Sequence, residues 1–142
     1  AEAQSLVEAV TKTAGDQMPP AEQRKLLKVQ ARIAMASGKG GEAAEALEKV
    51  VAGDPLDGDA IMLLAGHYQK SGQQEKAVFL YERAANIEAF EADAKVRLAQ
   101  LYVTMNRMGD AIPLLKRAQE LKPREAVAKY LEEIEKRFRS RK

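Results

Sequence analysis

Few residues of this 142-residue chain have the types and spacing that catalysis or metal binding requires. His67 is the single histidine, and no second His or Cys lies three or four residues away to complete a metal site or an activated nucleophile. Glu132 and Glu133 are neighbouring acids on a charged segment, without the apolar surroundings that acid–base catalysis by a carboxyl group needs. We therefore expect no catalytic residue, no metal, no cofactor and no enzymatic activity.

Two segments resemble ligand-binding loops in part but lack essential residues. The segment 38–41 (Gly-Lys-Gly-Gly) has the wrong spacing for a phosphate-binding loop, and no Ser or Thr follows its lysine. We expect Gly40 and Gly41 to form a turn between helices. In the segment 54–65, Pro55 interrupts the ligand spacing of a calcium loop and Ala65 replaces its closing acid, so Asp57 is expected to cap a helix instead.

Lys25, Lys28 and Arg32 are more informative, because intervals of three and four residues place them on one helix face. Such a cluster can hold an anionic group through charge-assisted hydrogen bonds. Ordinary solvated helix charges are the alternative interpretation, and the sequence leaves both open.

The last seven residues form a second basic cluster, which is interrupted by Phe138 and Ser140. Its cations are Lys136, Arg137, Arg139, Arg141 and Lys142. This tail could contact phosphates or an anionic surface, or it could simply be a solvated helix end. The formal net charge is only +2, which argues against a nucleic-acid binder that uses its whole surface.

Composition limits the remaining classes. The absence of cysteine excludes disulfides and thiolate sites. Neither a signal peptide nor an apolar run long enough to span a membrane is visible, so we expect a soluble protein whose compartment the sequence does not reveal.

The elements that must position these residues are predicted helices separated by Gly, Pro, Ser and Asp. Their expected ranges are 2–13, 21–36, 42–52, 58–70, a helix that ends near residue 86, 91–105, 108–121 and 125–138. Residues of similar size recur in these helices at a fixed interval of 34 residues. Two series consist of alanine and a third of bulky residues: Ala31, Ala65 and Ala99; Ala43, Ala77 and Ala111; Leu47, Tyr81 and Leu115. A period of this length in helical segments indicates a repeat array.

With a small residue in each helix, Tyr68 and Tyr102 late in the first helix, and Pro55 and Pro123 after the second, the chain resembles the tetratricopeptide repeat family. The resemblance implies an all-α fold, an α-solenoid of antiparallel helix pairs in a right-handed superhelix. It divides the chain into an N-terminal helix and linker (1–18), three repeats (19–57, 58–91 and 92–125), and a C-terminal capping helix with the basic tail (126–142). The middle repeat matches best; in the third, Asn106 replaces the usual turn glycine, and the first is the weakest match.

In this family the first helix of each repeat lines a concave groove that binds partners. Carried over by register, the expected groove residues are Lys25, Lys28, Arg32, Met35, Asp59, Met62, Gly66, Gln69, Asp93, Val96, Arg97 and Gln100. Some co-chaperone members grip a C-terminal carboxylate with five Lys, Asn and Arg residues. The corresponding positions here are Lys28, Arg32, Leu63, Asp93 and Arg97, and since only Lys28 and Arg97 match, we do not expect that clamp.

The resemblance therefore implies a protein-interaction module that presents its groove to a peptide or helix of a partner protein, as an adaptor or assembly scaffold. The partner could carry an anionic group for the basic end. Two other hypotheses stay open: a structural spacer or self-association segment of a larger protein, with homo-oligomers formed through the terminal helices, and nucleic-acid binding through the basic tail.

Overall fold

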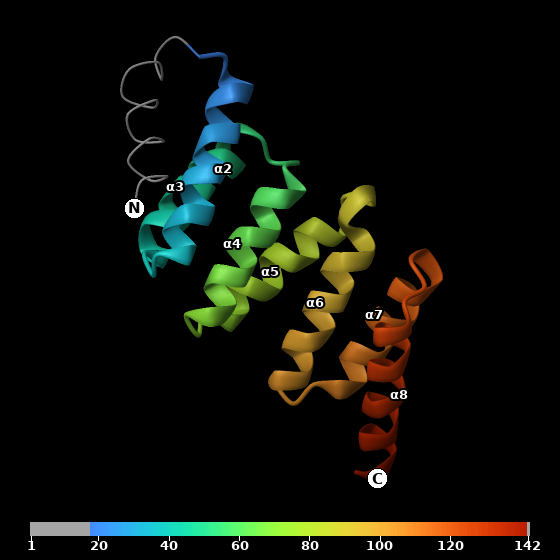
Figure 1. The fold of residues 1–142 in the computed structure, drawn as a ribbon. Helices are drawn as coiled ribbons and strands as arrows, with labels where there is room; N and C mark the ends of the chain where they lie inside the picture. Colours follow the sequence, from blue (N-terminus) through green and yellow to red (C-terminus); the bar gives the residue numbers. More distant parts are fainter. Residues whose placement is uncertain (1–17, 142) are drawn as a thin grey trace. The chain divides into compact units, whose positions relative to one another are not determined.

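The computed structural model describes residues 18–141, which form α-helices joined by short turns (Figure 1). In chain order the elements are α2 (Pro20–Ala36), α3 (Gly40–Gly53), α4 (Gly58–Lys70), α5 (Gln74–Ala85), the short 3-10 helix η2 (Glu88–Phe90), α6 (Glu91–Thr104), α7 (Met108–Leu121) and α8 (Glu125–Ser140). No strand occurs in this part of the chain, and the predicted all-α fold is confirmed. The helix expected over residues 2–13 lies outside the described residues.

The chain divides into two compact units, Ala1–His67 and Tyr68–Lys142, and the division falls within α4. In the first unit α2 packs against α3. In the second unit α6 packs against both α5 and α7, and α8 packs against α7. Helices α2 and α3, like α6 and α7, are joined by a tight turn and run antiparallel (Figure 1).

The alanines of the two periodic series lie in the core of each unit. Ala31, Ala43 and Ala65 in the first unit are completely buried. Ala77, Ala99 and Ala111 in the second are also completely buried. Because alanine has the smallest side chain after glycine, it allows helices to approach closely and leaves the volume to bulky neighbours such as Leu47 and Leu115.

The turns within the helix pairs share one backbone conformation at positions 34 residues apart. Gly38, Gly72 and Asn106 have φ of 76°, 81° and 63°. After each of them, the next residue's N–H donates to a carbonyl five residues earlier, as in Gln73 to Tyr68 at 2.8 Å. Asparagine is among the few other residues that tolerate this left-handed conformation, which explains how Asn106 replaces the turn glycine.

The expectation that Gly40 and Gly41 form a turn is wrong, because both belong to α3. Gly38 already closes the turn, so the helix begins directly after Lys39. Gly40 has a packing role instead: a Cβ atom on it would lie 2.9 Å from the His67 ring, closer than carbon atoms tolerate. The imidazole therefore rests against the first turn of α3, in agreement with a structural role for His67.

Helix α8 buries the apolar stripe predicted for it. Val127 and Ile134 are buried, and Tyr130, Leu131 and Phe138 are half-buried. The Phe138 ring lies against Gly109 of α7, where a Cβ atom would meet it at 3.3 Å. None of the helices in residues 18–141 combines the length and the apolar character needed to cross a membrane.

Candidate functional site

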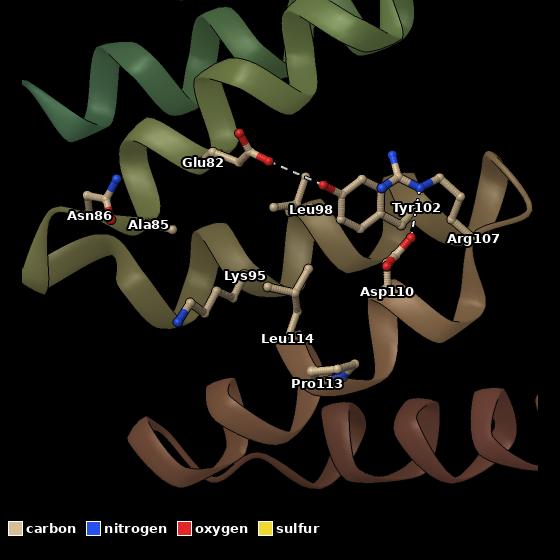
Figure 2. A pocket seen from close by; sticks show the side chains of 10 residues that line it. All are labelled: Glu82, Ala85, Asn86, Lys95, Leu98, Tyr102, Arg107, Asp110, Pro113 and Leu114. Carbon is tan, nitrogen blue, oxygen red and sulfur yellow. Dashed lines mark hydrogen bonds and ion pairs between the residues drawn. The ribbon is translucent and has the colours of Figure 1, made fainter.

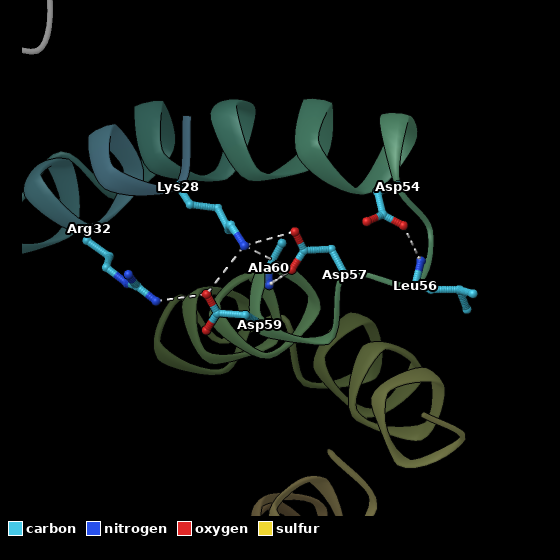
Figure 3. A network of polar contacts seen from close by, with 7 residues as sticks. All are labelled: Lys28, Arg32, Asp54, Leu56, Asp57, Asp59 and Ala60. Atoms are coloured by element: carbon cyan, nitrogen blue, oxygen red, sulfur yellow. Dashed lines mark hydrogen bonds and ion pairs between the residues drawn. The ribbon is translucent and has the colours of Figure 1, made fainter. Parts of the chain in front are cut away.

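Two of the three basic residues predicted at one end of the groove, Lys28 and Arg32, lie in an ion-pair network of the first unit (Figure 3). The ammonium group of Lys28 on α2 lies 3.0 Å from Asp57 and 3.8 Å from Asp59. Arg32, one turn later on α2, donates to Asp59 at 2.8 Å. Two cations of α2 are thus balanced by two carboxylates at the start of α4.

Asp57 has two roles at this junction. Its Oδ1 atom accepts a hydrogen bond from the Ala60 amide at 3.0 Å, so its predicted capping role is confirmed. The same carboxylate pairs with Lys28, and the two side chains are only 12% and 21% exposed. This shielded pair binds α2 to the first turn of α4 more firmly than a pair on the open surface would.

The other predicted groove residues of the first unit differ in how far they are exposed. Lys25 is largely exposed and has a loose contact of 3.8 Å with Glu22 on its own helix. Met35, Met62 and Gly66 are half-buried. The structure therefore gathers Lys28, Arg32 and Asp59 in direct contact, whereas Lys25 stays outside that network.

In the second unit, Asp93 on α6 lies 3.0 Å from Arg124 and 3.7 Å from Lys122, both beyond the end of α7. Gln69 accepts a hydrogen bond at 3.0 Å from the Tyr81 hydroxyl, which ties the end of α4 to α5. Val96 and Gln100 are half-buried. Asp93 and Gln69 are thus engaged in contacts within the unit.

Among the predicted cations, Lys28 and Arg32 form close ion pairs, whereas Arg97 does not. Its side chain is exposed, and no carboxylate lies within ion-pair distance of it among residues 18–141. Burial raises the pKa of the Tyr81 hydroxyl above its ordinary value of 10.0, while the positive charge of Arg97 lowers it. The guanidinium thus acts on the Tyr81 hydroxyl through its charge.

The second unit also contains an open cleft of about 490 Å³, which the sequence did not predict (Figure 2). Its lining comes from α5 and the residue that follows it (Glu82, Ala85 and Asn86), from α6 (Lys95, Leu98 and Tyr102), and from α7 with the turn before it (Arg107, Asp110, Pro113 and Leu114). Pro113, which stands inside a helix and is exposed, was the one sequence signal that could have drawn attention to this face.

Tyr102 is the central polar group of the cleft. Its hydroxyl donates to Glu82 at 3.3 Å, and the Arg107 guanidinium lies 4.2 Å from the centre of its ring. Arg107 is held in turn by Asp110 at 2.9 Å. Burial, and after it the negative charge of Glu82, raise the pKa of Tyr102 above its ordinary value of 10.0.

The groups that resembled catalytic or metal-binding residues take structural positions. Glu132 and Glu133 pair with Lys136 and Arg137 one turn later, at 3.3 and 2.5 Å, and form the charged outer face of α8. Within the described part of the chain, no three His, Cys, Asp or Glu side chains are placed to hold a metal ion.

Comparison with known proteins agrees with the architecture. Two sequence models of the tetratricopeptide repeat match residues 34–93 and 92–125, which together make up more than half of the chain. No curated protein matches the sequence significantly.

Similar solved structures share the fold at low sequence identity. The type III secretion translocator chaperone SycD of Yersinia enterocolitica is 21% identical with a TM-score of 0.77, over 87% of this chain and 90% of that one. The N-terminal domain of stress-induced protein-1 from C. elegans is 16% identical with a TM-score of 0.76, over 83% and 98%. The first domain of Spaghetti (RPAP3), bound to an HSP90 peptide, is 19% identical with a TM-score of 0.74, over 82% and 96%.

Proposed function

Since the chain belongs to the tetratricopeptide repeat family, we propose that it is a non-enzymatic protein-interaction module. Residues 19–57, 58–91 and 92–125 form its three repeats in this proposal, and the exposed faces of their first helices bind a peptide or helix of a partner protein. The face on α6 supplies the anion-binding position.

Two of the similar structures support a peptide-binding role. The Spaghetti domain was solved with the HSP90 peptide SRMEEVD. The Yersinia chaperone was solved with a peptide of the translocator YopD, and that structure is 22% identical to this chain with a TM-score of 0.73. Both proteins use this fold to bind a short segment of another protein, which is the mode of action proposed here.

The observation that carries the proposal is the exposed and uncompensated charge of Arg97. It stands beside the half-buried Val96 on α6, with Gln100 one turn further on the same face. A guanidinium that has no carboxylate partner can bind an anionic group without first giving up an existing ion pair. To bind an anionic ligand, Lys28 and Arg32 would have to break their ion pairs with Asp57 and Asp59. We therefore propose that these two cations hold α2 to α4.

The expected ligand is therefore a peptide with one acidic side chain next to apolar residues. Apolar contacts would come from Val96 and polar ones from Gln100, which can donate to or accept from a peptide backbone. The five-residue carboxylate clamp of the co-chaperones does not fit these positions. Only two of its five positions carry a matching residue, and one of these, Lys28, is already paired with Asp57.

A peptide-display selection against the full chain tests the proposal. Recovered peptides are titrated by calorimetry into the wild type, Arg97→Ala and the matched control Arg139→Ala, which removes an exposed arginine from α8. We expect Arg97→Ala to weaken binding about tenfold, or about 1.4 kcal/mol, and Arg139→Ala to leave it unchanged.

Two results would contradict the proposal. Selected peptides that bind Arg97→Ala as tightly as the wild type would remove the α6 face from consideration. Failure to select any peptide, together with a mass that rises with concentration in light scattering, would favour the spacer or self-association alternative.

A further inference from the structure

We propose that the cleft bounded by α5, α6 and α7 is a second docking site, which accepts a protein segment carrying a basic side chain next to an apolar one. The cleft lies entirely in the second unit and is walled by the second helices of two helix pairs. It is therefore separate from the Arg97 face of α6, and this inference goes beyond the proposed function.

The Leu98 side chain and the ring of Tyr102 give the base of the cleft an apolar surface. Leu98 and Tyr102 are 3% and 8% exposed, and Ala85, Pro113 and Leu114 add apolar surface around them. The volume of about 490 Å³ falls within the range of roughly 300–1,000 Å³ that is usual for small-ligand sites. An inserted leucine-sized side chain can contact this base on several sides and gain from the loss of water there.

The two cations that line the cleft are already neutralised. Lys95 lies 2.6 Å from Glu91, and Arg107 lies 2.9 Å from Asp110 while it stacks on Tyr102. An anionic ligand would have to compete with these close carboxylates. The cleft is consequently a poor site for acidic segments.

Glu82 is the lining charge without a cationic partner. Its carboxylate accepts only the Tyr102 hydroxyl at 3.3 Å, and no Lys or Arg of the described residues lies within ion-pair distance. Figure 2 shows this carboxylate directed from α5 toward the Tyr102 hydroxyl at the edge of the cleft. A carboxylate has further lone pairs, so it can accept hydrogen bonds from an incoming guanidinium or ammonium group.

An exposed aromatic residue extends this surface along α5. Phe79 lies one turn before Glu82 and is 60% exposed, with the Arg83 guanidinium 6.0 Å from its ring centre. Large apolar side chains in such a position are frequent anchors in protein interfaces. Phe79 thus offers a further apolar contact one helical turn from Glu82 to a segment in which the basic residue has apolar neighbours.

NMR titration of the full chain tests the inference with a small probe, the acetylated and amidated tetrapeptide Ala-Arg-Leu-Ala. The controls are Ala-Glu-Leu-Ala, which reverses the charge, and Ala-Arg-Ser-Ala, which removes the apolar side chain. We expect the first peptide to shift amide signals around Glu82, Leu98 and Leu114 with a dissociation constant on the order of 1 mM. Both controls should bind at least about threefold more weakly.

Glu82→Gln tests the charge without loss of shape, and Glu75→Gln removes another exposed acid from the first turn of the same helix. We expect Glu82→Gln to weaken binding of Ala-Arg-Leu-Ala about fivefold and Glu75→Gln to leave it unchanged. Equal affinity for the three peptides, shifts confined to residues around Arg97, or an unchanged affinity of Glu82→Gln would each overturn the inference. An Arg97→Ala variant that still binds the probe separates this site from the proposed function.

Discussion

Asp59 and Asp93 occupy the same position of the 34-residue period, near the start of α4 and α6, but they pair in opposite directions along the chain. Asp59 takes its cations from the preceding first helix, where Lys28 and Arg32 lie. Asp93 takes Lys122 and Arg124 from the segment that follows α7. The first arrangement holds two helices of one unit together, whereas the second fastens the connection between α7 and α8.

Two substitutions within the period explain the difference. The residues 34 positions after Lys28 and Arg32 are Met62 and Gly66, which carry no charge. The ion-pair network of the first unit therefore cannot repeat on α4. The same period that keeps the core alanines constant leaves the surface of each first helix free to differ, and these differences give each repeat its own chemistry.

The largest expected effect comes from Asp57→Ala. The variant loses the helix cap on Ala60 and also leaves the shielded Lys28 without its closest carboxylate. We expect α2 and α4 to lose about 2–3 kcal/mol of local stability, measured by hydrogen exchange of their amides. Asp54→Ala is the control, since Asp54 accepts a single exposed hydrogen bond from Leu56. An equal loss in both variants would contradict the dual role of Asp57.

Lys28→Met should have the next largest effect. Methionine is chosen because it is the residue that α4 carries at the equivalent position, Met62. The shielded Asp57 then keeps its charge without the ammonium group, and we expect a loss of about 1–2 kcal/mol in denaturant unfolding. Met62→Lys is the reciprocal change and should alter stability by less than about 0.5 kcal/mol. Similar effects of the two variants would show that the network contributes little.

Asp93→Asn should cost less than about 1 kcal/mol, since its ion pairs are more exposed than the pair of Lys28 and Asp57. The loss should appear in the hydrogen exchange of the first turn of α8, because Arg124 directly precedes that helix. Its guanidinium is held to Asp93 through Nη1, while its buried Nε and Nη2 atoms have no hydrogen-bond partner in the described structure. A loss in α4 with none in α8 would refute the forward pairing.

The smallest expected effect is on the pH dependence of stability, through the carboxyl group of Glu91. This residue lies 34 positions after Asp57. Hydrogen bonds from Lys95, and after it Arg117, hold the pKa of Glu91 below its ordinary value of 4.5. The ionised form therefore stabilises the fold above about pH 4.5, and this contribution is lost as the pH falls through the lowered pKa of the folded state.

NMR titration of the Glu91 carboxyl group measures this pKa directly. Arg117→Ala should move it upward toward the ordinary value, and Lys129→Ala, which removes the partner of Glu125 on α8, should leave it in place. A carboxyl pKa that is indifferent to Arg117 would rule out the bridge between α6 and α7.

Much of the fold could be predicted because it depends on residue size and backbone conformation, and both can be read locally. Completely buried alanines such as Ala65 and Ala99 mark helix contacts, and Gly72 marks a left-handed turn. The prediction that Gly40 forms a turn was wrong, because a glycine can be required for two different reasons. It may be needed for a backbone conformation with positive φ, or because a neighbouring group leaves no space for a side chain. At this position it makes room for the His67 ring.

The candidate site was less predictable because it depends on which side chains meet. The period placed Lys28, Arg32 and Asp59 on one surface, and their opposite charges could have suggested mutual neutralisation. It did not show that the loop before α4 brings Asp57 to Lys28 as well. The cleft escaped prediction because Leu98 and Tyr102 read as core residues, while its depth depends on the distance between α5 and α7.

Calorimetric titration of one selected acidic peptide into the wild type, Arg97→Ala and Arg32→Ala tests the central claim most directly. In our proposal the paired arginine of α2 stabilises the structure, and the unpaired arginine of α6 binds the ligand. We expect an affinity loss of about tenfold for Arg97→Ala and of less than about twofold for Arg32→Ala. The reverse order, with Arg32 required and Arg97 dispensable, would contradict the proposal.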